Sequence, residues 1–230
     1  MKGKTRKIII LCLFIVALYL GFKFYCYNIY SNGDSGQISD VNISGNMTIN
    51  HIDLNDNEYY TFQDIKFKNV FDGFEMNSDD PFLRMIKKVD SNISDAILIG
   101  SEQQYIDILK NDEEYKGVFN KIAKKENIND DIDLLKYMEK HNDDEVKFFM
   151  PLIKQKQIST ITIFKMTMLP SIHYVKTVDG YYKGFMFKTT KDTFEVVLIE
   201  NNKRYFFTFL GNYDEEFINE FMNSVIIEKK

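Results

Sequence analysis

The residues with the clearest capacity for chemistry are oxygen-bearing side chains in one N-terminal loop. The stretch DLNDNEYYTFQD places Asp53, Asn55 and Asn57 at alternate positions and Asp64 at its last position. This spacing is typical of a calcium loop. Glu58 stands where such a loop needs glycine, and the flanking residues do not indicate helices. We therefore expect a solvated loop that leads into a strand, and no metal site.

Paired carboxylates are a second candidate, because two acids in one pocket with separated pKa values can act as general acid and base. Four such acids lie where helices are expected to begin, and there a negative charge also stabilises the helix dipole: Asp130, Asp131, Asp143 and Asp144. Catalysis requires these side chains to converge in one pocket. A structural role requires only that they lie at helix ends.

Other catalytic patterns are missing. Gly100 and Ser101 stand between an expected strand and helix, as in a nucleophile elbow, but the pattern G-x-S-x-G is absent and a helix cap explains the serine. His51, His141 and His173 are far apart in the sequence and show no H-x-x-x-H spacing. No glycine-rich phosphate loop is present. We expect no catalytic residue, no metal and no cofactor.

Aromatic residues provide the candidate binding site. The chain has 20 Phe and 14 Tyr but no Trp. The alternation in TFEVVLIE and RYFFTF predicts that most aromatic residues of the C-terminal part point into a core. The remaining tyrosines would form a contact patch on one exposed sheet face: Tyr174, Tyr181, Tyr182 and Tyr205.

The elements that position these residues begin with strands and continue into helices. The stretch YYTFQDIKFKNVFDGFEM is rich in strand-forming residues and has a turn signal at Asp72-Gly73. Ala96–Ile99 is expected to be a short buried strand that turns through Gly100 into a helix capped by Ser101 and Gln104. Two amphipathic helices should follow, with apolar residues at helical spacing: Tyr115, Val118, Phe119 and Ile122 in one, and Ile132, Leu135 and Met138 in the other, which starts at Asn129 or Asp130.

The C-terminal part predicts an antiparallel sheet. Pro151 should interrupt any further helix, and STITIFKM is expected to be a strand. Two hairpins should turn at Asp179-Gly180 and Asn201-Asn202, and the second would place Glu200 opposite Lys203. A final helix is expected in NYDEEFINEFMNSV, with Ile218 and Met222 on its flank and with inward residues Phe217, Phe221 and Val225. Strands with helices grouped between and after them predict an α+β domain with a mainly antiparallel sheet flanked by helices.

The N-terminus predicts a membrane anchor. Four basic residues precede the apolar run Ile8–Phe22, and no small-residue cleavage site follows in KFYCYNIY. If Lys23 carries its charge to the interface, a helix over residues 8–30 is long enough to cross a bilayer. We expect residues 1–30 to be an uncleaved single-pass anchor, with the N-terminus in the cytoplasm and the C-terminal domain outside the cell membrane. A cleaved signal peptide and an interfacial helix are the alternatives.

Composition bounds the rest of the chain. Residues 31–50 are rich in Gly, Ser, Asn and Asp and predict a flexible stalk. Residues 51–230 should form one domain, with a helical middle over about 101–150 and a C-terminal sheet and helix over about 158–230. The first thirty residues hold five of the 29 basic residues and none of the 34 acidic ones, so the remainder is acidic and unsuited to nucleic acid. Both cysteines lie in or beside the apolar segment, which leaves the domain without a disulfide or a thiolate nucleophile.

Two stretches resemble PsbP-like domains. YTFQDIKFKNVFDGFEM is similar to the opening strand and Pro-Glu-Gly-Phe of that family, although Val70, Phe71 and Asp72 stand where a Pro-Glu pair is usual. RYFFTFLGNYDEEFINEFMNSVIIE is similar to the family's closing strand, helix and short strand. The resemblance implies a single α/β/α sandwich that serves as a binding or accessory module. The whole chain also resembles membrane-anchored proteins of low-GC Gram-positive bacteria, which implies a location.

Three functions follow as hypotheses. The first is a membrane-anchored extracytoplasmic accessory or binding module, whose partner is a protein or a component of the cell envelope. The alternative is a membrane-anchored, carboxylate-dependent hydrolase of an envelope substrate. In the third, the N-terminal helix itself associates with another membrane protein through Ala17 and Gly21.

Overall fold

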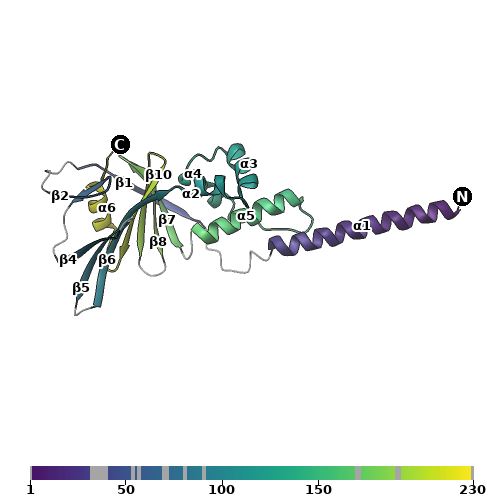
Figure 1. Cartoon of the computed structure of the whole chain (residues 1–230), viewed down its shortest axis with the longest axis horizontal. Helices are drawn as coiled ribbons and strands as arrows, with labels where there is room; N and C mark the ends of the chain where they lie inside the picture. The colour runs from purple at the N-terminus through teal and green to yellow at the C-terminus, as the bar shows by residue number, and fades with distance from the viewer. Residues whose placement is uncertain are drawn as a thin grey trace.

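The chain forms an α+β structure with a long N-terminal helix (Figure 1). A computed structural model describes residues 2–31, 41–52, 55, 58–68, 73–79, 82–89, 92–168, 172–189 and 193–228. In helix α1, Lys2–Ser31, side chains are described for residue 15 and residues 17–30. Within these residues there are six helices, an eight-stranded sheet and a three-stranded sheet, which confirms the predicted fold class.

The large sheet has the order β1-β7-β8-β9-β10-β6-β5-β4. Every neighbouring pair is antiparallel except β1 with β7. The strands are β1 Ile43–Ile49, β4 Phe74–Asp79, β5 Phe82–Val89, β6 Asn92–Gln103, β7 Ile172–Gly180, β8 Lys183–Thr189, β9 Phe194–Glu200 and β10 Lys203–Leu210.

The hairpin between β9 and β10 forms as its turn residues predict. Asn201 and Asn202 have φ of 51° and 60°, the left-handed conformation that a type I′ turn requires. Glu200 pairs with Lys203, so the predicted register is confirmed. Turn chemistry alone is sufficient here because it acts within four residues.

The hairpin between β7 and β8 also forms, but its turn is displaced. Asp179 and Gly180 belong to β7 and pair with Thr48 and Ile49 of β1, so the chain turns through the next residues instead. A Cβ on Gly180 would come within 2.4 Å of the Ile49 carbonyl oxygen, and its φ is 98°. Glycine is therefore needed at this position for close strand pairing and not for a two-residue turn.

The predicted stalk contributes to the folded domain. Residues 43–49 form β1, in which Met47 and Ile49 are buried. Val41 is also buried, and its main-chain N–H and carbonyl both bond to the Asn142 side chain, at 3.1 and 2.7 Å. The expectation of a flexible stalk is wrong for residues 41–50, because β7 offers them a strand partner. Residues 32–40 lie outside the described part of the chain.

One face of the large sheet is covered by helix α6, Glu215–Asn223, and the small sheet. The small sheet has the order β11-β3-β2, with β2 Tyr59–Phe62, β3 Ile65–Lys68 and β11 Ile226–Ile227. Asp214 caps α6 by accepting a hydrogen bond from the Phe217 N–H at 2.8 Å. Phe217 is only half-buried, so the inward face is rotated from the predicted one. The fully inward residues are Ile218, Phe221, Met222 and Val225.

Four helices cover part of the opposite face and form a second core. They are α2 Tyr105–Asn111, α3 Lys116–Glu126, α4 Asp131–Lys140 and α5 Leu152–Met168. The amphipathic patterns predicted for α3 and α4 are confirmed, and Asp130 caps α4 by accepting from the Asp133 N–H at 2.8 Å. Figure 1 shows α2–α5 between the large sheet and α1, with α6 beyond the sheet.

Two local predictions are wrong. STITIFKM lies within α5, because Ile158, Ile161 and Phe164 recur at helical spacing and are all buried. Pro151 starts this helix and does not interrupt it, since its carbonyl accepts the Gln155 N–H at 3.0 Å.

The expected capping box after β6 does not form either. The strand continues through Gly100 and Ser101 to Gln103 because it pairs with β10 along this length. Gln104 takes the N-cap position of α2 without a side-chain cap, and its amide oxygen instead accepts the Asp131 N–H at 3.2 Å.

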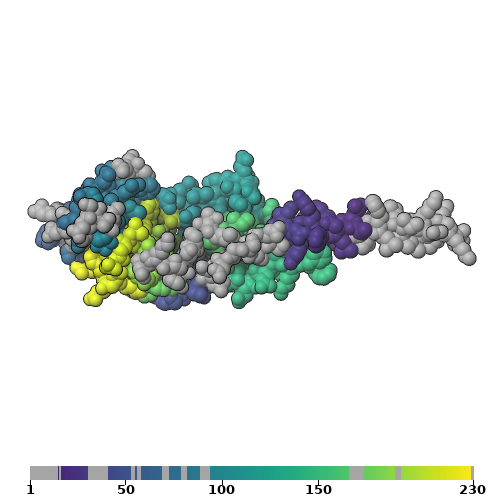
Figure 2. Space-filling model, turned by 90° about the horizontal axis from the view of Figure 1, so that it is seen from below, coloured from purple at the N-terminus to yellow at the C-terminus, as the bar shows by residue number. Residues whose placement is uncertain are grey.

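Helix α1 packs against the start of α5. Figure 2 shows the described atoms of α1, in purple, beside the green atoms of α5. Lys23 is only 6% exposed, and its Nζ donates to the carbonyls of Phe148, at 3.3 Å, and Met150. It therefore does not extend to an interface as predicted. In the described residues no helix has both the length and the apolar character needed to cross a membrane.

Candidate functional site

An open pocket lies on the helix-covered face of the large sheet, at the end that the helices leave bare. Its cavity volume is about 400 Å³. Strand residues form most of its wall, and Tyr105 of α2 closes one side. The strand residues are Phe82, Arg84, Leu98, Glu102, Glu195, Arg204, Phe206 and Thr208.

Strand register brings these residues together from distant parts of the chain. Arg84 pairs with Leu98, Leu98 with Thr208, and Thr208 with Glu195. Residues opposite one another on neighbouring strands share a sheet face. The four side chains therefore form one row across β5, β6, β10 and β9.

The next row forms an apolar floor around a glycine. Phe82 and Phe206 both pair with Gly100 of β6. A Cβ on Gly100 would lie 2.6 Å from Cζ of Phe206 and 2.8 Å from Cδ1 of Phe82. Its absence lets the two rings meet over the strand, with centroids 5.6 Å apart and planes at 52°. Tilted contact of this kind is favourable for aromatic pairs.

Arg204 is a buried cation beside this floor. Its guanidinium lies 4.2 Å from the ring centroid of Tyr105, a cation–π contact. Nε is 3.0 Å from Oε1 of Glu102, and Nη2 is 3.7 Å from Oε1 of Glu195. Behind them, Nη1 is 4.0 Å from Oδ2 of Asp131. Nε and Nη1 are buried, and within the described residues their contacts with Glu102 and Asp131 are ion pairs without hydrogen-bond geometry.

Burial shifts the pKa of two acids that lie beside Arg204. Burial raises the pKa of Glu195, although the cation of Arg204 and a hydrogen bond from Thr208 oppose the rise. Burial also raises the pKa of Asp131. The main-chain N–H groups of Tyr105 and Ile106, at 3.0 and 2.9 Å, and the Arg204 charge oppose that rise. Arg204 therefore favours the negatively charged form of both carboxylates, together with these hydrogen bonds.

Arg84 supplies a second cation at the edge of the pocket. Its side chain is exposed, and it has no ion pair with another described residue. The pocket thus combines an accessible guanidinium with the apolar surface of Phe82 and Phe206. Chemically, it suits a group that carries an acid next to an apolar or aromatic body.

The four predicted tyrosines do not form one exposed patch. Tyr181 is 58% exposed and its ring stacks on His51, with centroids 4.7 Å apart. Tyr174 is half-buried, and its hydroxyl donates to Glu215. Tyr182 and Tyr205, only 4% and 1% exposed, belong to the core, because the small sheet covers their face. The prediction that these two are exposed is therefore wrong.

The buried hydroxyls of these two tyrosines have specific partners. Tyr182 accepts the Ile227 N–H at 2.7 Å, and burial raises the pKa of Tyr182 to about 12. Tyr205 donates to Oδ2 of Asp64 at 3.0 Å. Each hydroxyl thus ties the large sheet to the small one.

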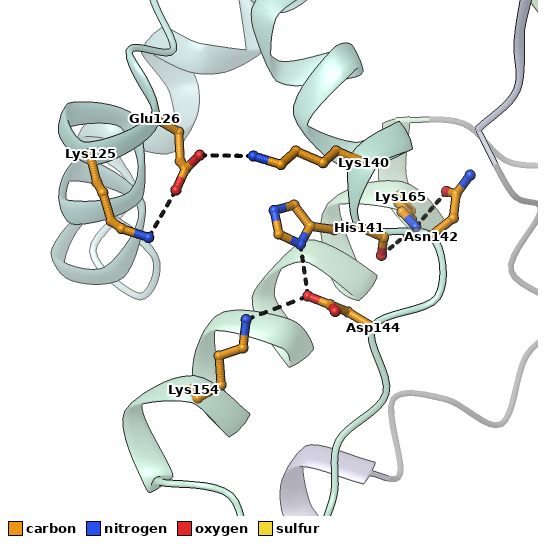
Figure 3. Close-up of polar contacts among 8 residues, drawn as sticks. All are labelled: Lys125, Glu126, Lys140, His141, Asn142, Asp144, Lys154 and Lys165. Atoms are coloured by element: carbon orange, nitrogen blue, oxygen red, sulfur yellow. Dashed lines mark hydrogen bonds and ion pairs between the residues drawn. The ribbon is translucent and has the colours of Figure 1, made fainter.

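The predicted acidic residues do not converge on a pocket. Asp130 caps α4, and Asp131 bonds the start of α2. Asp144 instead pairs with Nδ1 of His141 at 2.7 Å and with Nζ of Lys154 at 3.5 Å (Figure 3). Asp143 is exposed. Asp130, Asp131 and Asp144 thus have structural roles at helix ends. Asp143 and Asp144 follow the end of α4 and do not begin a helix as predicted.

The calcium-loop pattern lies partly outside the described residues, which exclude Asp53 and Asn57. Asp64 is buried and bonded to a tyrosine hydroxyl. In the described part of the chain, no three His, Cys, Asp or Glu residues lie where they could share a metal ion. The side chain of His173 also falls outside the description.

The pocket residues were not predicted, although the sequence has a signal for them. Arg204 and Glu195 are charged residues within KRYFFTFL and FEVVLIE, two strands that are otherwise largely apolar. A charge in such a strand indicates a polar site on one sheet face. Periodicity does not show which distant residues complete that site.

No family model matches this chain, and neither a curated protein nor a solved structure is similar to it. The resemblance to PsbP-like domains stays a prediction. Fold and pocket together define the class as an α+β protein with an amphiphilic pocket on its sheet.

Proposed function

We propose that this protein is a membrane-anchored, extracytoplasmic binding module whose site is the pocket on β5, β6 and β10. Its ligand is an acidic group next to an apolar or aromatic body, presented by a protein or by a component of the cell envelope. The observation that carries the proposal is the accessible Arg84 beside the Phe82–Phe206 floor.

Charge and burial support this ligand class. An acidic group can pair with Arg84 without competing with a residue of the described chain. The guanidinium of Arg204, buried in the pocket wall, adds a second positive charge beside the site. An apolar body over the two rings would remove apolar surface from water, which contributes about 25 cal/mol per Å².

The anchor is proposed from helix α1. Away from its contact with α5, the helix exposes large apolar side chains, which is typical of a helix that requires an apolar environment: Ile15, Leu18, Tyr19, Leu20, Phe22, Phe24, Tyr25 and Ile29. The apolar sequence continues from Phe14 back to Ile8. The basic N-terminus favours a cytoplasmic location for that end.

The competing function, a carboxylate-dependent hydrolase, would have to use Glu102 and Glu195 in the same pocket. The raised pKa of Glu195 favours it, because a general acid must hold its proton near neutral pH. Arg204 opposes it, because its cation contacts both acids and stabilises their charged forms.

Saturation-transfer NMR on the full chain in nanodiscs tests the binding function. The probes are 3-phenylpropionate and, as a matched neutral compound, 3-phenylpropanol. We expect Arg84→Gln to weaken binding of 3-phenylpropionate about tenfold, which corresponds to about 1.4 kcal/mol. Binding of 3-phenylpropanol should not change. Phe82→Ala should weaken the binding of both probes.

Lys121→Gln, on the surface of α3, is the matched control and should change the binding of neither probe. The binding proposal fails if wild-type protein prefers the alcohol, or if Arg84→Gln and Lys121→Gln behave alike.

A further inference from the structure

Two apolar side chains of the domain itself are more exposed than any other large apolar residue in the described chain. Phe149 is 89% exposed and Ile153, in the first turn of α5, is 73% exposed. Single exposed apolar residues are common, but two neighbouring ones of this size indicate a contact surface. They lie in Lys147–Lys156, which we name the collar segment.

Helix α1 holds the collar segment in place. The Nζ of Lys23 donates to the carbonyls of Phe148 and Met150, the residues on either side of Phe149. The Tyr27 ring packs edge-on against Phe148, with centroids 5.8 Å apart. The exposed Phe149 therefore lies at the same level along α1 as Lys23, where the apolar helix meets the domain.

Internal bonds also brace the collar segment. Gln155 is fully buried, and its Nε2 donates to the carbonyls of Lys147 at 2.7 Å and Phe148 at 3.2 Å. Lys154 pairs with Asp144, which also holds His141 (Figure 3). A turn with this many bonds presents Phe149 in a defined place.

The charge of the collar segment identifies its partner. Its sequence KFFMPLIKQK contains Lys147, Lys154 and Lys156, all exposed, and no acid. The chain after residue 30 has, by contrast, more acidic than basic residues. Lysines beside exposed aromatic and aliphatic side chains are typical of segments that bind the surface of an anionic bilayer.

We infer that the collar segment enters the headgroup region of an anionic lipid bilayer next to α1. Phe149 and Ile153 lie at the boundary with the acyl chains, and Lys147 and Lys156 contact lipid phosphates. The inference rests on the proposed membrane anchor. It fixes the domain on the membrane surface at a second point, and Figure 1 shows strands β5 and β6 at the end of the molecule away from α1.

Single tryptophans test the inference, because the chain has none of its own. The full chain is reconstituted into vesicles of phosphatidylglycerol and phosphatidylcholine with brominated acyl chains. We expect Phe149→Trp to emit at shorter wavelength and to lose at least half of its emission to the bromines. Tyr181→Trp, exposed in the turn between β7 and β8, is the matched control and should stay unquenched.

A third variant separates the inference from the anchor. Phe22→Trp in α1 reports whether the helix enters lipid at all. Quenching of Phe22→Trp without quenching of Phe149→Trp overturns the collar inference and leaves the anchor standing. If neither is quenched, both fail. A blue-shifted but unquenched Phe149→Trp means that protein covers the segment, which also overturns the lipid contact.

Lipid charge gives a second measurement. Lys147→Gln with Lys156→Gln should reduce the quenching of Phe149→Trp in vesicles that contain phosphatidylglycerol. It should have little effect in pure phosphatidylcholine, where no excess negative charge attracts the lysines. Equal quenching with and without the two lysines would remove their role.

Discussion

The guanidinium of Arg204 lies over the ring of Tyr105, 4.2 Å from its centroid, and Asp131, Glu102 and Glu195 surround it. The strand β10 and the first turn of α2 meet through this contact. One buried cation thus joins the sheet, the helical layer and the pocket wall. Changes at this position should affect both stability and binding.

Loss of the Arg204 cation should be strongly destabilising. Arg204→Met leaves the buried Asp131 and the half-buried Glu195 without their counter-charge, and breaking a buried ion pair typically costs about 3–5 kcal/mol. Urea unfolding of the detergent-solubilised full chain measures this change. Arg84→Met is the matched control, because Arg84 is exposed and should change stability by less than about 0.5 kcal/mol. Similar losses for the two variants would contradict the role given to Arg204.

Stability should fall with rising pH because of Glu195. Its pKa is raised above the ordinary 4.5 by burial, so the folded state binds its proton more tightly than the unfolded state. That stabilisation is present at low pH and is lost as pH rises from 4.5 through the folded pKa. Glu195→Gln removes the loss, so it should gain stability relative to wild type across this window. Unfolding free energies measured at several pH values would show the difference.

Glu215 should show the opposite sign and serves as the comparison. Burial raises its pKa, but hydrogen bonds from Lys176 and Tyr174 outweigh burial and hold it below 4.5. Its stabilisation is present above pH 4.5 and is lost as pH falls through the folded pKa. Glu215→Gln should therefore lose stability relative to wild type near neutral pH, and less at acid pH. Parallel pH profiles for Glu195→Gln and Glu215→Gln would refute both assignments.

Two glycine-to-alanine changes should act in opposite directions. At Gly100 the new methyl group would meet the rings of Phe82 and Phe206, which must then separate. Gly100→Ala should therefore lower the free energy of unfolding by about 1–3 kcal/mol and weaken the binding of 3-phenylpropionate. At Gly117 in α3 nothing lies within 4 Å of the added Cβ. Gly117→Ala should therefore stabilise the chain by up to about 1 kcal/mol. Thermal unfolding of both variants gives the comparison, and a neutral Gly100→Ala would show that the rings need no gap.

Local signals determined several elements without help from the rest of the chain. The α3 and α4 periodicity, the Asp130 cap and the Asn201-Asn202 turn are each encoded within a few residues. Their energies come from neighbours in the sequence, so pattern and turn chemistry predict them correctly. The fold class followed from the order of these elements.

Elements that depend on distant partners could not be predicted in this way. Alternating Thr and Ile in STITIFKM favour a strand, but burial of one helical face against α3 and the sheet makes the segment helical. Residues 43–49 carry little strand signal and become a strand because β7 pairs with them. Tyr205 follows a strand pattern, and only the small sheet decides that its side is covered.

The candidate site shows the same division. The sequence by itself determined which strands are apolar and that charged residues interrupt them. Only the tertiary structure decided that Arg84, Glu195 and Arg204 meet, because cross-strand register joins residues far apart in the chain. A one-residue slip would turn each of these side chains to the other face, so the pocket exists only in the folded sheet.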